Sequence, residues 1–254
     1  MTLIIHASET ASYAIRYAGV RTGKLAVSLS LAGMVLLVSR TSNLIQAPMM
    51  GKIIDYAKMN SDYNLELPLR YIIGASSVGT FVAIAAFPSL VFVFARMIVH
   101  FDIQGSIAKV ISSVTVEKLR NVRSHLRRPS FGMLVSLRIM GIPKRLLLLN
   151  CIVTAIYTVG VLASLYASYL APELSTTASQ SSGLINGIAT IILTIFIDPQ
   201  MALLTDKALG FPRESARLGR VFALLMFSRL AGTLLAQAML VPATKWLIWV
   251  IQYI

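Results

Sequence analysis

The stretch from Leu25 to Ala47 reads LAVSLSLAGMVLLVSRTSNLIQA, and Arg40 is its one charged residue. At 1.5 Å per residue, a helix of this length crosses a hydrocarbon layer of about 30 Å. Four further apolar stretches follow it: Tyr71–Ala95, Leu146–Leu170, Leu184–Leu204 and Val221–Pro242. This pattern predicts a polytopic membrane protein.

The composition also favours a membrane protein over a soluble one. Hydrophobic residues make up 56% of the 254 residues and charged residues 13%, whereas about 25% are charged in ordinary soluble domains. No stretch alternates as a strand would, so we expect an all-α fold, a polytopic membrane helical bundle with about six spans. The additional span is Met1–Ala18, which is short and polar; its alternative is an amphipathic helix lying in the membrane interface.

Few residues suit a metal, disulfide or enzyme site. Cys151 is the single cysteine, and His6, His100 and His125 show no ligand spacing. HExxH, phosphate-cradling, GxSxG and Ser/His/Asp patterns are missing, so we predict no enzyme activity, no catalytic residue, no metal and no cofactor. Basic cytoplasmic loops explain the formal net charge of +13 better than nucleic acid does, and we expect no nucleic-acid partner.

The charges of the loops predict the orientation of the chain. Residues 101–145 carry two acids and nine basic residues: Lys109, Lys118, Arg120, Arg123, Arg127, Arg128, Arg138, Lys144 and Arg145. The loop at Ala171–Gly183 has one charge, Glu173, and the loop at Thr205–Arg220 is again basic. By the positive-inside rule, the first and third loops lie in the cytoplasm and the second outside, and six spans then place both termini outside.

A weak internal repeat suggests how the spans are organised. The segments that begin at Pro48 and Pro199 match at five of ten positions, at an offset of 151 residues. We therefore expect two inverted three-helix repeats, a frequent plan in transporters, with residues 1–100 and 146–254 as the halves and residues 101–145 as a basic linker. The alternative is a shared helix-end chemistry of proline followed by a polar stop.

The linker has a pattern of its own. Ile107, Val110, Ile111 and Val114 recur at helical spacing, apart from the neighbouring basic residues. This pattern is typical of an amphipathic helix on anionic membrane lipids, although a solvated basic linker fits it equally well.

The segment from Ser39 to Pro48 is the richest in polar residues. On a helix, Arg40 and Asn43 share one face and Gln46 lies beside it. A guanidinium with neighbouring amides can grip a phosphate because it offers several donors in a rigid fork. The alternative is that Arg40 only joins helices.

Other charges complete the set of candidate site residues. An isolated charge within a span costs about 2.5–3.5 kcal/mol on insertion scales. We therefore expect Asp198 to balance a cation, with Arg40 and Arg229 as the leading partners, unless it stays hydrated at the interface. The remaining candidates are Arg16 and Arg21 for an anionic headgroup and Glu9 for charge balance, and the alternatives for Arg21 and Arg229 are anchoring of a turn and snorkelling to the inner surface.

Two N-terminal motifs carry a family resemblance. The segments Tyr13–Gly23 (YAIRYAGVRTG) and Ser39–Pro48 (SRTSNLIQAP) resemble those of the Amj family of bacterial lipid II flippases, alternates to the MurJ flippases. The length, the hydropathy and the segment Asp198–Gln200 are also similar, so the resemblance covers nearly the whole chain. It implies movement of lipid II, a peptidoglycan precursor, from the inner to the outer leaflet of the bacterial cytoplasmic membrane.

The residues fit this function without requiring it. A polyprenyl diphosphate needs a cationic, hydrogen-bonding cavity, which Arg16, Arg21, Arg40, Asn43, Gln46 and Arg229 would line. The alternatives are a secondary transporter or channel for another anionic solute, a lipid-modifying enzyme, or a scaffold without transport activity. Because six spans of a 27.7 kDa chain enclose little volume, a homodimer is a further expectation.

Overall fold

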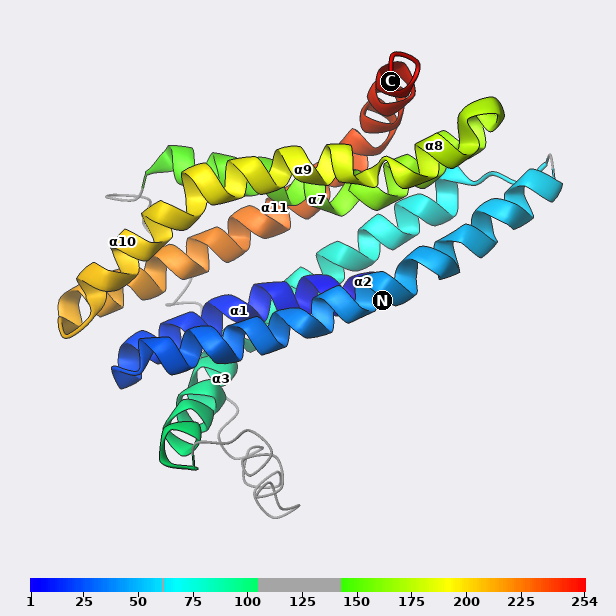
Figure 1. Ribbon diagram of the computed structural model, residues 1–254. Helices are drawn as coiled ribbons and strands as arrows, with labels where there is room; N and C mark the ends of the chain where they lie inside the picture. The colour runs from blue at the N-terminus through cyan, green and yellow to red at the C-terminus, as the bar shows by residue number, and fades with distance from the viewer. Residues whose placement is uncertain (61, 105–142) are drawn as a thin grey trace.

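A computed structural model describes residues 1–60, 62–104 and 143–254, and all of its regular elements are helical. Figure 1 shows them along the chain as α1 (Thr2–Thr22), α2 (Leu25–Met59), α3 (Glu66–Gln104), α7 (Lys144–Leu170), η1 (Pro172–Leu174), α8 (Ser175–Gln180), α9 (Ser182–Ile192), the π-helical turn η2 (Leu193–Ile197), α10 (Asp198–Ala208) and α11 (Pro212–Ile251). The described residues contain no strand, which confirms the predicted all-α fold. The pattern expected in residues 107–114 lies outside the described residues.

Five helical segments are long and apolar enough to cross a membrane: Leu25–Met59, Glu66–Ile103, Lys144–Leu170, Pro172–Ala208 and Pro212–Ile251. They contain the five predicted spans, but most extend further because polar residues continue the helices beyond the apolar stretches. This confirms a multi-pass membrane protein.

The helix α1 is too polar to be counted with these five, yet it lies within the bundle. It packs against α2, α3 and α11. It buries His6, Thr10 and Ser12 together with apolar residues such as Ile15. Its place among three helices differs from that of a helix lying apart in the membrane interface.

Three glycines inside the predicted spans allow close helix contacts. A Cβ atom at Gly79 would collide with the backbone of Leu3, and one at Gly232 would meet the carbonyl oxygen of Cys151. Gly160 faces the side chain of Asn186. These contacts bring α1 against α3, α11 against α7, and α9 against α7, as small residues do in membrane bundles.

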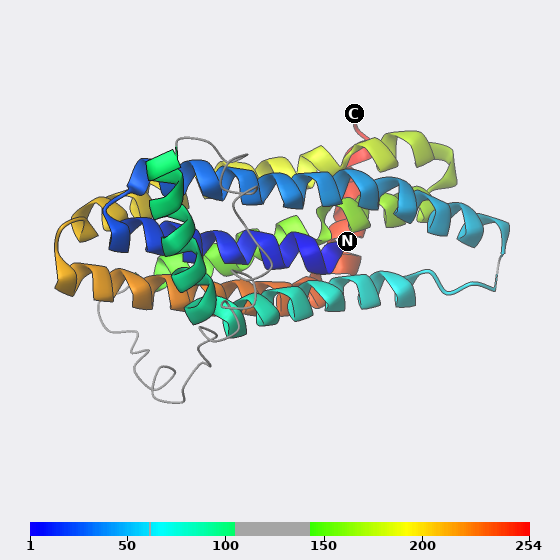
Figure 2. The same ribbon diagram turned by 90° about the horizontal axis from the view of Figure 1, so that it is seen from below.

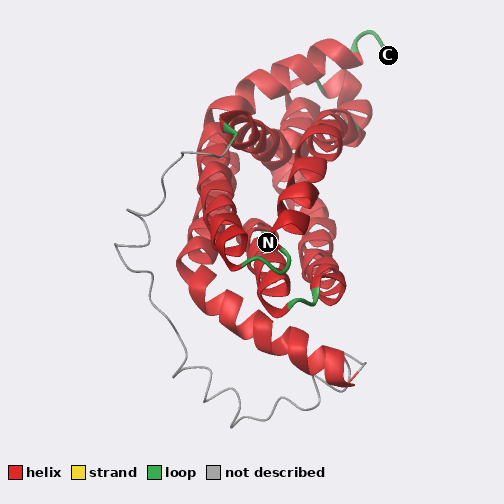
Figure 3. Ribbon diagram, turned by 90° about the vertical axis from the view of Figure 1, so that its left-hand side faces the viewer, coloured by secondary structure: helices red, strands yellow, loops and turns green. Residues whose placement is uncertain are grey.

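The turns collect at the two ends of the bundle. The α1–α2 turn at Gly23 and the α10–α11 turn at Gly210 lie at one end, and the α2–α3 connection and α8 lie at the other (Figure 2). Both glycines have positive φ, 69° and 77°, which other residues rarely adopt. Figure 3 looks along the bundle from the end with these glycines and shows the helices arranged around a common axis.

Candidate functional site

A cavity of about 370 Å³ lies between helices from both parts of the chain. The wall made by α1 and α2 carries most of the charge, with Thr2, His6, Glu9, Ser12, Tyr13, Arg16, Ser39, Arg40, Asn43 and Gln46. The wall made by α7, α9, α10 and α11 is mainly neutral and polar, with Asn150, Thr154, Tyr157, Thr158, Asn186, Asp198 and Arg229. Apolar residues, including Leu36 and Val153, complete the lining.

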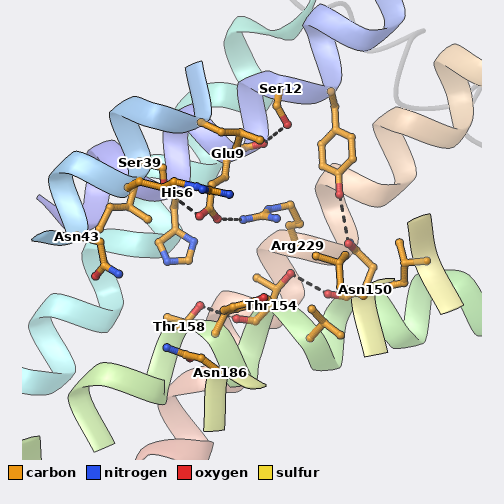
Figure 4. A pocket seen from close by; sticks show the side chains of 18 of the residues that line it. His6, Glu9, Ser12, Ser39, Asn43, Asn150, Thr154, Thr158, Asn186 and Arg229 are labelled. Carbon is orange, nitrogen blue, oxygen red and sulfur yellow. Dashed lines mark hydrogen bonds and ion pairs between the residues drawn. The ribbon is translucent and has the colours of Figure 1, made fainter. Parts of the chain in front are cut away.

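An ion pair between Glu9 and Arg229 joins the two walls of the cavity (Figure 4). Glu9 comes from α1 and Arg229 from α11, and their side chains are 31% and 15% exposed. The hydroxyl of Ser39 on α2 donates a hydrogen bond to the other Glu9 oxygen, at 2.9 Å. The Glu9 carboxylate therefore joins three helices.

Arg16 and Arg40 are the cavity's two cations that form no ion pair with a described residue. Arg16 is half-buried, and its Nε is buried with no hydrogen-bond partner in the described part of the chain. Arg40 is exposed on α2, next to the Ser39 that holds Glu9. With Glu9 neutralising Arg229, these two guanidiniums remain to bind an anion.

Most of the opposite wall is already hydrogen-bonded. Asn150 accepts a hydrogen bond from the Tyr13 hydroxyl and donates one to the Leu225 carbonyl, which ties α7 to α1 and α11. The hydroxyls of Thr154 and Thr158 donate to carbonyls one turn earlier. The Oδ1 of Asn186 is an exception, because it is buried without a partner.

The cavity brings together all but one of the predicted site residues: Glu9, Arg16, Arg40, Asn43, Gln46, Asp198 and Arg229 line it. Arg21 does not. It is exposed at the end of α1, with its guanidinium 6.0 Å from the centre of the Tyr17 ring. Arg16 follows Glu9 by seven residues, about two helical turns, so the two side chains lie on the same face of α1. Arg21 lies beyond the last turn that faces the cavity.

The expected pairing of Asp198 needs correction. Arg229 pairs with Glu9 rather than with Asp198, because α1 packs beside α11 and brings Glu9 within reach. Asp198 is exposed and forms no ion pair with a described residue.

On α2 the buried face holds Ser39, Ser42 and Gln46, and the Gln46 amide oxygen accepts a hydrogen bond from Thr2.

The polar cavity residues that sequence reasoning missed include His6, Asn150 and Asn186. Each carries a signal in the sequence. His6 and Glu9 are three residues apart and so share a helix face, and Asn150 and Asn186 are single amides at the edge of or within apolar stretches, where an uncompensated polar group is costly. Among the described residues, no group of three or more His, Cys, Asp or Glu could hold a metal ion.

Comparisons with known proteins give a consistent result. Residues 1–251 match the model of a family described as Amj, alternate to MurJ. A relative, the Lipid II flippase Amj of Bacillus subtilis (strain 168), is 41% identical over 253 residues, which cover 99% of this chain and 94% of the relative. No solved structure matches the chain.

Proposed function

This chain belongs to the Amj family, and from that membership we propose that it is a lipid II flippase. It is then a transporter rather than an enzyme, and it serves the synthesis of peptidoglycan for the cell wall. The near full-length relative named for this activity supports the assignment.

The structural observation that supports the proposal is the cavity, on whose wall Arg16 and Arg40 form no ion pair with any residue that the structure describes. Lipid II has a diphosphate between its polyprenyl tail and its sugars. A guanidinium matches phosphate oxygens with two parallel hydrogen bonds, so these arginines are suited to hold the diphosphate. Asn43 and Gln46 add amides on the same side, and the tail can remain in the lipid.

The size of the cavity indicates that transport needs a wider state. Sites for small molecules occupy about 300–1,000 Å³, and the cavity of about 370 Å³ is near the lower limit. A disaccharide with a peptide is larger than a drug-sized ligand. The two walls must therefore separate to admit the whole headgroup.

The orientation of the protein belongs to the proposal. The turns that carry Lys24 and Lys207 lie at one end of the bundle, where the pairing of Lys24 with Asp102 also places the end of α3 (Figure 2). This grouping supports a cytoplasmic location for that end and for residues 101–145, with the N-terminus outside. A potential that is negative inside would then aid outward movement by roughly 2.3 kcal/mol per net negative charge per 100 mV.

The inverted repeat, the anionic-lipid contact of the linker and a homodimer remain proposals. The repeat has some support from helix boundaries, because an offset of 151 residues brings the single helix α2 onto the series α8, α9 and α10. The same offset brings Pro48 inside α2 onto Pro199 in the first turn of α10.

Accessibility of lipid II on the outer leaflet tests the proposed function. In cells depleted of their other lipid II flippases, expression of this protein should make the precursor accessible to an external enzyme or antibiotic probe. Arg40→Ala should abolish that gain at equal protein level. Arg21→Ala is the matched control, because it removes an arginine outside the cavity and should leave accessibility unchanged. No gain with the wild-type protein would contradict the proposal.

A further inference from the structure

The ion pair between Glu9 and Arg229 connects two parts of the molecule that also share apolar contacts, chiefly between α3 and α11. Glu9 belongs to the N-terminal helices, α1 to α3, and Arg229 to the C-terminal helices, α7 to α11. The ion pairs Lys24–Asp102, Glu66–Arg70 and Glu214–Arg217, which also join described residues, each stay within one of these parts. The Glu9–Arg229 pair thus fastens the two parts together at the cavity.

We propose that this pair is a latch that the substrate opens: the diphosphate of lipid II takes the place of the Glu9 carboxylate on Arg229. The inference rests on the proposed function, because the competing anion is the headgroup of that substrate. Carboxylate and phosphate use the same guanidinium fork. Glu9 therefore occupies Arg229 until a stronger anion arrives.

Charge favours the exchange. A diphosphate diester carries two negative charges, whereas Glu9 carries one. Arg16 and Arg40 on the wall made by α1 and α2 line the same cavity as Arg229 on the opposite wall, so the diphosphate has all three guanidiniums around it. The pair is partly shielded from solvent, at 31% and 15% exposure, so Coulomb attraction within it exceeds that of a surface pair. Contacts of the dianion with the guanidiniums of Arg16, Arg40 and Arg229 offset the loss of the contact between Glu9 and Arg229.

The N-terminal helices can hold Glu9 after it leaves Arg229. Ser39 already donates a hydrogen bond to it from α2, and the neighbouring Arg40 lies in the same cavity. His6 is three residues from Glu9 and only 5% exposed, and its Nδ1 has no hydrogen-bond partner among the described residues (Figure 4). These groups reduce, without removing, the cost of leaving the carboxylate without its cation.

Release of the latch leaves the other contacts between the two parts, which are shared apolar clusters and hydrogen bonds. Near the latch these include the hydrogen bond from Tyr13 to Asn150, at 3.2 Å. Near the opposite end, Arg70 and Gln237 each donate to the other's backbone carbonyl, at 2.8 and 2.9 Å. Among the ion pairs between described residues, Glu9–Arg229 is the one that joins the two parts, and it lies at the cavity. It is therefore the contact that an anionic ligand in the cavity can exchange, and its loss favours widening of the cavity around the headgroup.

Binding of a diphosphate lipid by the purified full-length protein in nanodiscs tests the latch. The probe is undecaprenyl diphosphate, and the measured quantity is its Kd. Glu9→Gln removes the competing charge while keeping the shape, so the Kd should fall about tenfold, which corresponds to loss of a pair contributing about 1.4 kcal/mol. Flipping of lipid II by this variant should slow, because the latch no longer closes.

Glu66→Gln is the matched control. It breaks the ion pair with Arg70, which lies away from the cavity, and it should leave the Kd unchanged. Glu9→Asp keeps the charge but shortens the reach, so it should lower the Kd by a smaller factor and serves if Glu9→Gln does not fold. An unchanged or higher Kd in the Glu9 variant that folds, while the wild type binds the probe, overturns the latch and leaves the proposed function standing. No binding by either the wild type or the Glu9 variants overturns both.

Discussion

At the scale of single residues, the sequence identifies the charged members of the site better than their contacts. Arg40, Asp198 and Arg229 stand out because each is a charge in an apolar stretch, and the structure places all three on one cavity. The pairing could not be predicted, because it depends on how α1 packs against α11. Glu9, 220 residues away in sequence, is the partner that this packing supplies.

The role of Arg40 leads to the first prediction. Arg40→Lys keeps the positive charge but loses the planar fork, so lipid II transport should fall by about tenfold or more. The measurement is the rate of lipid II appearance on the outer leaflet, normalised to protein level. Lys58→Arg, a change in the opposite direction at an exposed position outside the cavity, should have no effect. Wild-type transport with Arg40→Lys would show that charge alone suffices.

The pairing of Arg229 with Glu9 leads to the second prediction. Arg229→Gln leaves Glu9 without its cation, and an unpaired buried charge costs about 3–5 kcal/mol, discounted here because Glu9 is partly exposed. The amount of folded protein should therefore drop. A second change, Glu9→Gln, should restore the amount but not transport. Asp198→Asn is the comparison variant, and rescue by it instead would contradict the pairing.

At the scale of elements, the apolar helices were predictable and α1 was less so. The five long segments follow from hydropathy, although the helix ends and the continuation of the helices through Pro48, Pro88 and Pro242 had to come from the structure. The helix α1 has too many polar residues to be identified as a span, yet those residues are buried against α2, α3 and the cavity. A polar helix inside a bundle has no distinctive pattern until its neighbours are known.

The packing of α1 on α3 gives the third prediction. Gly79→Ala places a Cβ against the backbone of Leu3, which cannot move without shifting α1. Overpacking of this kind costs about 1–3 kcal/mol, so the detergent-solubilised protein should unfold at a lower temperature. Gly33→Ala is the control, since its Cβ would meet nothing within 4 Å, and it should be neutral or stabilising. Equal loss in both variants would contradict the close contact.

At the scale of the whole molecule, the loop charges predicted that the α1–α2 turn and the α10–α11 turn lie on the same side of the membrane. The turns at Gly23 and Gly210 lie at the same end of the bundle (Figure 2), as an even alternation of helices requires. The sequence could not reveal the cavity, because its lining comes from helices more than a hundred residues apart. The family, by contrast, was accessible from two short motifs.

The orientation is the fourth prediction and is checked by labelling. In a variant without Cys151, a cysteine at Thr177 should react with an impermeant reagent added outside intact cells, and a cysteine at Arg213 should react only after permeabilisation. Both positions are exposed, so accessibility to water is not limiting. The reverse pattern would invert the orientation.

The central claim is tested most directly by flipping in a purified system. Proteoliposomes containing this protein and a fluorescent lipid II should be compared with liposomes containing the Arg40→Ala variant, and a membrane-impermeant quencher should report the fraction of lipid II in the outer leaflet over time. We predict that the wild type exchanges the lipid between leaflets and that the variant behaves like protein-free liposomes. Equal rates in wild-type and protein-free liposomes would contradict the account.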